Sequence, residues 1–289
     1  MSRPSPIQFF KQSLKSESYY ADELVNIYLL RPVAAIIVWA IYSTRITPNQ
    51  VTVIAIFIGL ASATAYLFAA PAAVWIAGVL ILAKDILDDA DGQLARAKKI
   101  YSRRGRFLDS IGDFVVDWAV FSAITYTLCQ TYPVISTILL GILSLTGITL
   151  RVSYHVYYQV SFLHLEERYA LNRITEEITD EDRKGDPVAL GLQKIFIMIY
   201  SRQDRLMYRI DRWCKGKNFD ERLSVTWYAD RFALRLSGLI GFGTELLILA
   251  ICSWKNELHI YLFINVVLMN GIWLVNILYR RLILARNLK

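Results

Sequence analysis

Long apolar stretches, separated by short polar ones, run through most of the chain. Six of them are long enough for a helix to cross a hydrocarbon core of about 30 Å, which takes roughly 20 residues. They cover residues 48–69, 72–96, 107–128, 133–158, 232–252 and 258–280. The pattern predicts an all-α, polytopic integral membrane protein with six transmembrane helices.

Two further segments have mixed patterns. Residues 20–46 combine a short apolar run with charged positions, including Arg31, which favours an interfacial helix over a membrane span. Residues 163–230 are polar and carry acidic and basic residues in near-equal number, which predicts a cytoplasmic helical insert. In its second half, apolar residues at helical spacing indicate an amphipathic helix lying on the membrane or on the protein. They are Ile195, Ile199, Leu206, Ile210 and Trp213.

These patterns divide the chain into four parts. Residues 1–46 form an N-terminal cytoplasmic or interfacial segment, and 47–162 hold the first four membrane helices. Residues 163–230 are the insert, and 231–289 hold the last two membrane helices and a basic tail. In "TPNQ", Thr47 can cap a helix and Pro48 suits its first turn, so the first span is expected to begin there.

Composition and charge support a membrane protein and set its orientation. Hydrophobic residues make up 55% of the chain, and the mean hydropathy is +0.37. The expected external turns near 69–73, 129–133 and 253–258 contain one basic residue, Lys255. Nearly all of the other lysines and arginines lie in segments on the opposite side, which predicts that both termini face the cytoplasm. The net charge of +7 then indicates topology and contact with the lipid bilayer, and no nucleic-acid partner is expected.

Aspartates occupy the inner ends of the second and third predicted spans. On a helix, residues three or four apart share a face, so Asp88 neighbours Asp91 and Asp109 neighbours Asp113. The loop between the two helices is short, so they must run antiparallel and bring four carboxylates together near the cytoplasmic boundary. Three further aspartates lie close by, at Asp85, Asp89 and Asp117.

Such a concentration of negative charge needs compensation. Protonation, basic partners or divalent cations could each supply it. Oxygen ligands suit Mg²⁺, Mn²⁺ or Ca²⁺ rather than zinc, and Mg²⁺ bound by carboxylates usually binds substrate phosphates too. Gly92 and Gly105 leave the backbone bare where a phosphate or a base could approach, and Arg96 can reach a carboxylate or a phosphate.

The stretches "DDADGQLAR" and "GRFLDSIGD" together resemble the signature of the CDP-alcohol phosphotransferase (CDP-alcohol phosphatidyltransferase) family. The matching positions are Asp88, Asp91, Gly92, Ala95, Arg96, Gly105, Asp109 and Asp113. The six spans, the interfacial helix and "TPNQVT" at the first span extend the resemblance. The insert at 163–230 is a departure from the smallest members.

The resemblance implies a membrane-embedded enzyme of phospholipid biosynthesis. It would move a phospho-alcohol or phosphatidyl group from a CDP-linked donor, either CDP-diacylglycerol or a CDP-alcohol, to the hydroxyl of an alcohol or lipid acceptor and release CMP. The implied metal ligands, for two Mg²⁺ or Mn²⁺ ions, are Asp88, Asp91, Asp109 and Asp113, and Asp113 is also the implied general base. The implied nucleotide contacts are Asp88, Gly92, Ala95, Arg96, Gly105 and Asp109. The active site would face the cytoplasm, and a homodimer is one expected assembly.

Polar residues outside the motif give weaker signals. Arg151, Arg231 and Arg235 lie at inner ends of spans, where they could bind a phosphate or headgroup, or equally reach the interface or pair with surface charges. Asp89 is expected to pair with a nearby base or to be solvated, and His155 is expected to be packed. Glu245 lies deeper and has no assignable partner.

Two other functions use intramembrane aspartates. An intramembrane prenyltransferase also binds a diphosphate through aspartates and Mg²⁺, but its acidic clusters should lie on distant helices. An ion or proton transporter should distribute acidic residues across the membrane depth. Here the aspartates gather at one side, which favours the transferase.

Overall fold

The computed structural model describes residues 5, 19–165, 176–217 and 219–287. These residues form helices joined by turns, with no strand among them, and the all-α prediction is confirmed. The remaining parts of the predicted N-terminal segment and insert, 1–4, 6–18 and 166–175, lie outside the described residues, as do 218 and 288–289.

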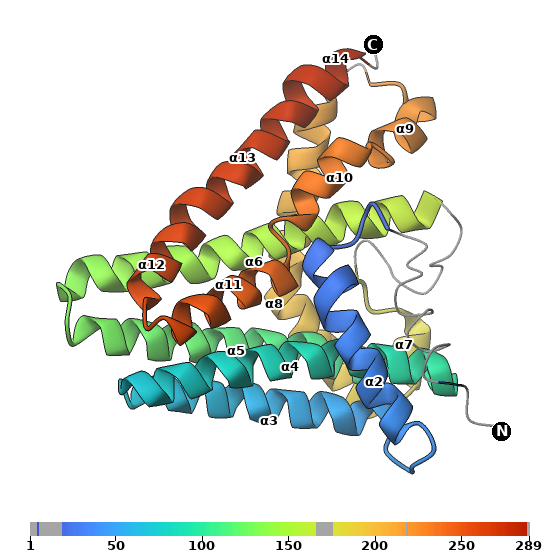
Figure 1. The fold of residues 1–289 in the computed structure, drawn as a ribbon. Helices are drawn as coiled ribbons and strands as arrows, with labels where there is room; N and C mark the ends of the chain where they lie inside the picture. Colours follow the sequence, from blue (N-terminus) through green and yellow to red (C-terminus); the bar gives the residue numbers. More distant parts are fainter. Residues whose placement is uncertain (1–4, 6–18, 166–175, 218, 288–289) are drawn as a thin grey trace.

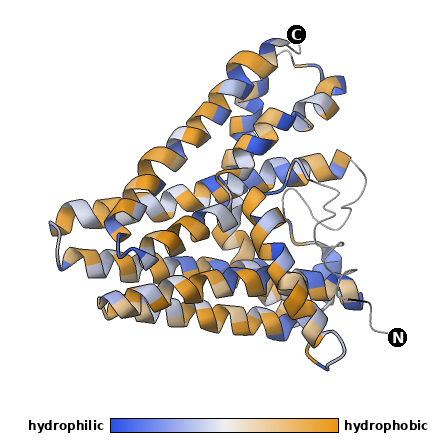
Figure 2. Ribbon diagram, viewed as in Figure 1, coloured by the Kyte–Doolittle hydropathy of each residue, from blue (hydrophilic) through white to orange (hydrophobic). Residues whose placement is uncertain are grey.

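Four long helices lie side by side and form the bundle (Figure 1). They are α3 (Pro48–Leu67), α4 (Pro71–Lys98), α5 (Arg103–Cys129) and α6 (Val134–Leu165). α3 packs against both α4 and α5, and α5 packs against α6. The start of α3 is as predicted: Thr47 accepts a hydrogen bond from Gln50 N, the Gln50 side chain accepts one from Thr47 N, and Pro48 opens the helix. Figure 2 shows apolar residues along most of these helices.

All six predicted spans are helical, and four are long and apolar enough to cross a membrane. These are Pro48–Leu67, Val134–Leu165, Arg231–Trp254 and Leu258–Leu284. The other two, α4 and α5, have 28 and 27 residues and are equally long. Their composition differs because they carry the aspartates.

The fifth span is not continuous, so the prediction of one helix over 232–252 was wrong in this respect. α10 (Arg231–Gly238) and α11 (Phe242–Trp254) are separated by a turn that ends at Gly241. A Cβ atom on Gly241 would collide with the side chain of Glu23. The Glu23 carboxylate accepts hydrogen bonds from the amide, at 3.0 Å, and the hydroxyl of Thr244 in the first turn of α11. The N-terminal segment therefore supplies an acceptor to an otherwise uncapped helix start.

The last span is one helical run that leans away from the bundle (Figure 1). It consists of α12 (Leu258–Phe263), a π-helical turn over Ile264–Met269, α13 (Asn270–Tyr279), a second π-helical turn over Arg280–Leu284, and α14 (Ala285–Asn287). Arg280, in the second of these turns, is fully buried. Its guanidinium stacks 3.6 Å from the Tyr158 ring centroid, which ties this run to α6.

The N-terminal part lies across the end of the bundle (Figure 1). It contains a π-helical turn over Asn26–Leu30 and then α2 (Arg31–Ile41), which packs on α4. The insert contains α7 (Asp180–Lys184), α8 (Pro187–Lys215), a 3₁₀ turn over Glu221–Leu223, and α9 (Ser224–Tyr228). α8 crosses the bundle and packs on α5 and α6. Its buried face holds Gln193, Met207, Asp211, Cys214 and Lys215, whereas the predicted apolar positions Ile195, Leu206 and Trp213 are exposed.

Candidate active site

Three of the predicted metal ligands meet where the inner ends of α4 and α5 face each other. Asp88, Asp91 and Asp109 each offer a carboxylate oxygen, and these oxygens lie within 4.8 Å of one another. Asp109 Oδ1 is buried and has no hydrogen-bond partner among the described residues. An all-carboxylate donor set with a free buried oxygen fits a hard divalent cation such as Mg²⁺ or Mn²⁺.

Asp113 lies one helical turn further along α5, beside a different partner. Its carboxylate contacts the ammonium of Lys84, which is fully buried and also lies 3.8 Å from Asp88. The sequence left open what compensates the negative charge of the aspartates. The structure shows that Lys84 is a basic partner of Asp113. The signal was available, because Lys84 precedes Asp88 by four residues on a helix.

The start of α3 supports the aspartates from a third side. The Thr52 hydroxyl donates a hydrogen bond to Asp91 Oδ2, and both side chains are buried. A Cβ atom on Gly105 would collide with Asn49 Oδ1, so this glycine allows the starts of α3 and α5 to approach closely. Sequence reasoning missed both contacts, although Asn49 and Thr52 lie within the "TPNQVT" that it singled out.

The other predicted nucleotide contacts lie at the inner end of α4. Gly92, Ala95 and Arg96 follow the aspartates toward the loop, and Arg96 is exposed. The nearest atoms to a Cβ on Gly92 would be the Arg96 guanidinium nitrogens, at 3.4 and 3.9 Å. The backbone at Gly92 is therefore open toward Arg96, and a phosphate could approach there.

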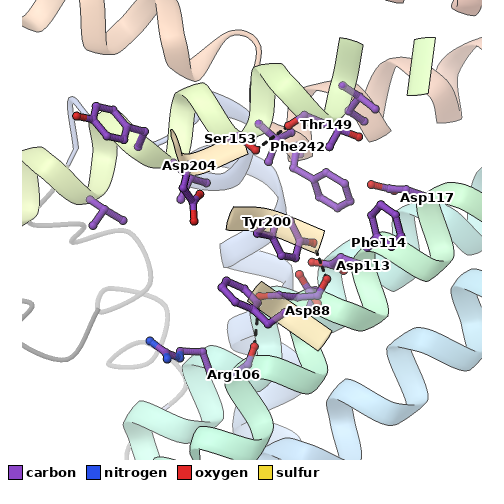
Figure 3. A pocket seen from close by; sticks show the side chains of 18 of the residues that line it. Asp88, Arg106, Asp113, Phe114, Asp117, Thr149, Ser153, Tyr200, Asp204 and Phe242 are labelled. Carbon is purple, nitrogen blue, oxygen red and sulfur yellow. Dashed lines mark hydrogen bonds between the residues drawn. The ribbon is translucent and has the colours of Figure 1, made fainter. Parts of the chain in front are cut away.

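A cavity of about 420 Å³ opens beside the aspartates (Figure 3). Its lining includes Asp88 and Asp113 but not Gly92, Ala95, Arg96 or Gly105. The opposite walls come from α6, through Thr149, Ser153 and Tyr157, and from α8, through Phe196, Tyr200 and Asp204. Tyr200 donates a 2.7 Å hydrogen bond to Ser110 O and so fixes α8 to α5 beside Asp113.

The insert also binds the start of α5 through charged pairs. Arg103 contacts Asp182, Arg104 donates to Asp186 at 2.6 Å, and Arg106 donates to Glu176 at 2.9 Å. The hydrogen bond from Arg103, together with one from Thr179 N, holds the pKa of Asp182 well below its usual range. The insert is therefore attached to the helix that carries Asp109 and Asp113.

The three arginines considered as phosphate ligands do not line this cavity. Arg151 is fully buried, donates to Glu245 at 2.9 Å and to Asn265 O at 3.1 Å, and so supplies the unassigned partner of Glu245. Arg231 stacks on Tyr20, with 4.4 Å from guanidinium to ring centroid, and Arg235 stacks on Tyr19 at 4.3 Å.

Two residues outside the motif lie as the sequence analysis expected. Asp89 lies 3.9 Å from Arg31, and the latter is paired with Asp22 at 2.7 Å. His155 is buried, with its Nδ1 3.3 Å from the Ser237 hydroxyl. Asp89 also lines the cavity, together with Asp85 and Asp117.

Comparison with known families adds to this geometry. The family model of the CDP-alcohol phosphatidyltransferases matches residues 45–213, which is more than half of the chain. The chain belongs to this family. The matched region runs from the turn before α3 to near the end of α8, so it contains the aspartates and most of the cavity wall. The description of this family as CDP-alcohol phosphatidyltransferases favours a transferase over the prenyltransferase and transporter alternatives.

Similar curated proteins from three organisms share a name, "Bifunctional IPC transferase and DIPP synthase". The chain is 39% identical to the one from Thermococcus kodakarensis over 82 residues, which cover 28% of this chain and 18% of that protein. For Archaeoglobus fulgidus it is 39% identical over 94 residues, covering 32% and 18%. For Aquifex aeolicus it is 39% identical over 80 residues, covering 28% and 18%. The chain thus matches less than a fifth of the length of these relatives.

Proposed function

We propose that this family member transfers a phospho-alcohol or phosphatidyl group from CDP-diacylglycerol or a CDP-alcohol to an acceptor hydroxyl in phospholipid biosynthesis, with release of CMP. The observation that carries the proposal is the meeting of Asp88, Asp91 and Asp109 at the motif spacing, with Asp113 on the cavity beside them. The name of the similar proteins is consistent with a transferase, but the match covers a small part of each of them.

The proposed cation ligands are Asp88, Asp91, Asp109 and Asp113, and the proposed ions are two Mg²⁺ or Mn²⁺. When bound, such ions would neutralise the donor diphosphate and the leaving phosphate of CMP. The nucleotide is proposed to lie along Asp88, Gly92, Ala95, Arg96, Gly105 and Asp109. Gly92 would leave room for it, and the exposed Arg96 guanidinium would donate hydrogen bonds to a phosphate oxygen.

The chemical step joins the acceptor oxygen to the donor's β-phosphorus as the bond from that phosphorus to the CMP oxygen breaks. Asp113 is proposed to accept the proton of the acceptor hydroxyl, because it lines the cavity from which an alcohol can arrive. Lys84 holds the Asp113 carboxylate in position. Across the cavity from Asp113, α8 contributes Asp204 to the wall. This wall limits the space in which the acceptor must be oriented.

The test is CMP release by the purified full-length protein. CDP-diacylglycerol and a panel of CDP-alcohols are each supplied with Mg²⁺ or Mn²⁺, with and without candidate alcohols. We expect CMP from at least one donor, dependent on an alcohol and abolished by EDTA. Asp91→Asn should abolish release, whereas Asp180→Asn, which makes the same change at an exposed position of α7, should not. Failure of every donor to give CMP would refute the proposed function.

A further inference from the structure

The cavity lies on one side of the aspartate cluster. It is lined by Asp113, the proposed base, whereas Gly92, Ala95, Arg96 and Gly105, proposed to contact the nucleotide, lie outside its lining. A nucleotide placed along those four positions leaves the cavity for the other reactant. Because the attacking hydroxyl has to reach Asp113, the cavity is where the rest of the acceptor alcohol must be accommodated.

The α8 wall contributes one carboxylate to this space. Phe196, Tyr200 and Asp204 lie on successive turns of α8 and face the cavity. Tyr200 is already engaged with Ser110 O, but the structure gives Asp204 no hydrogen bond or ion pair within the described chain. Figure 3 shows its carboxylate pointing into the open space. Burial raises the pKa of Asp204 to about 6, so near pH 7 it is ionised and able to accept hydrogen bonds.

The charge of the lining restricts what can bind beside Asp204. Arg106 is the only basic residue among the described residues of the lining, and its guanidinium already donates a hydrogen bond to Glu176. The acidic residues of the lining are Asp85, Asp88, Asp89, Asp113, Asp117, Glu176 and Asp204. Bound cations would offset the charge near Asp88, but Asp204 lies on the opposite wall. An acceptor with its own phosphate would meet uncompensated negative charge there.

We propose that Asp204 determines acceptor specificity: it accepts a hydrogen bond from a second donor group of the acceptor, a hydroxyl of a polyol or the ammonium of an amino alcohol, and disfavours phosphorylated acceptors. This inference rests on the proposed function. It differs from the sequence-based prediction that Arg151, Arg231 or Arg235 binds a phosphate. In the described lining of the cavity, the Asp204 carboxylate accepts hydrogen bonds, whereas a phosphate would need hydrogen-bond donors.

The test compares wild type, Asp204→Ala and Asp204→Asn, with Asp180→Asn as control, all as full-length protein in lipid nanodiscs. The acceptor panel is glycerol, myo-inositol, serine, ethanolamine and glycerol 3-phosphate. Asp204→Ala should raise the KM of the preferred unphosphorylated alcohol about tenfold or more, since a hydrogen bond to a charged group is lost. The KM of the CDP donor should stay within about twofold, which a general folding defect would not allow. Asp204→Asn should preserve polyol binding better than amino-alcohol binding, which distinguishes the two acceptor types.

Two outcomes of the kinetic comparison would overturn the assignment: an unchanged acceptor KM in Asp204→Ala, or a wild-type preference for glycerol 3-phosphate over glycerol. Calorimetric titration of the same alcohols into each protein needs no turnover. If wild type releases no CMP, the proposed function fails, but calorimetry still decides on Asp204. Absence of binding by every unphosphorylated alcohol, or equal affinity in wild type and Asp204→Ala, would reject it.

Discussion

Asp113 differs from the other motif aspartates in its surroundings. It faces the cavity and contacts Lys84, whereas Asp88, Asp91 and Asp109 converge with one another. A neighbouring ammonium favours the charged form of a carboxylate, and this is the form that can accept a proton from an alcohol. These different surroundings support the proposal that Asp113 acts as the base in addition to binding a cation, although all four aspartates belong to one sequence motif.

Replacing Asp113 by Asn tests this separation. Asp113→Asn should retain binding of the CDP donor within a few-fold but lower kcat by a factor of about 10² to 10⁴, which is the usual contribution of a general base. Donor binding is measured by calorimetry and turnover by CMP release. Near-normal turnover would remove the base role, and loss of donor binding would show that Asp113 is mainly a cation ligand.

Lys84 should matter most when no divalent cation is bound. Lys84→Met leaves Asp113 and Asp88 without their buried basic partner, and removing one member of a buried ion pair costs about 3–5 kcal/mol. We expect the variant's melting temperature to fall more in EDTA than in Mn²⁺, since bound cations would offset the aspartates. Equal loss in both conditions would mean that Lys84 acts by packing alone.

For individual residues, the sequence predicted contacts between neighbouring turns of a helix and missed contacts between segments far apart in the chain. Helical spacing and a short loop were enough to bring Asp88, Asp91 and Asp109 together, because α4 and α5 run antiparallel and both pack on α3. Thr52 and Asp204 could not be found in that way, since they come from other helices whose relative rotation no spacing rule gives. Arg151 was considered for substrate binding, yet it pairs with Glu245, which is 94 residues away.

At the scale of elements, the break between α10 and α11 depends on a buried acid. Burial raises the pKa of Glu23 from its usual 4.5 to about 7, although hydrogen bonds from Thr244 oppose the shift. The folded protein therefore binds this proton more tightly than the unfolded chain does. The resulting stabilisation is complete below pH 4.5 and is lost as the pH rises to about 7.

Glu23→Gln should remove this pH dependence. A shift from 4.5 to about 7 corresponds to about 3 kcal/mol, so the stability of wild type relative to Glu23→Gln should fall by up to that amount between those pH values. Thermal unfolding of both proteins in nanodiscs, from pH 4.5 to 8, measures the difference. A difference that does not change with pH would contradict the role of this proton.

The attachment of the insert to α5 is a second feature at this scale. Because hydrogen bonds hold the pKa of Asp182 low, its contribution is present above its usual pKa and is lost as the pH falls. Asp182→Asn should lower the free energy of unfolding by about 1 kcal/mol at pH 7. The difference from wild type should shrink below about pH 4, the usual pKa of Asp.

Asp186→Asn is the matched control for Asp182→Asn. It makes the same change in a pair whose aspartate side chain is 30% exposed, compared with 3% for Asp182, so its effect should be smaller. Chemical unfolding curves of the two variants give the comparison. An Asp186 effect equal to or larger than that of Asp182 would show that burial does not decide the strength of this attachment.

Most elements were predictable from sequence, but their continuity and rotation were not. The apolar periods located all six spans, and the Thr47 and Pro48 signals located the start of α3. The break at Gly241 was missed because its cause, Glu23, lies far away in sequence. The packing face of α8 was missed because its buried side contains the polar residues Gln193 and Asp211. Their burial depends on hydrogen bonds with Asp182 and Trp227, which only the folded structure brings close.

For the whole molecule, the charge distribution predicts a cytoplasmic active site. In Figure 2, polar residues gather at the end of the bundle near α7, and the basic loop between α4 and α5 belongs to that end. Basic loops are retained on the cytoplasmic side during insertion. The short turn between α5 and α6, at the opposite end, should therefore face outward.

Two matched tyrosines test this orientation. In a Cys129→Ser background, we expect a membrane-impermeant maleimide to label Tyr132→Cys in intact cells and Tyr101→Cys only after permeabilisation. Both positions are exposed, at 40% and 68%, so accessibility within the protein is not limiting. Labelling of Tyr101→Cys in intact cells would reverse the proposed topology.

The cap that Glu23 supplies to α11 also constrains how the protein is made. Glu23 leaves the ribosome long before Thr244, which follows 221 residues later. Until the fifth span has been translated and inserted, the carboxylate has no helix start to bind, and the N-terminal segment cannot take its final position across the bundle. Docking of the segment around Glu23 is therefore a late step of biogenesis, because it has to wait for α11.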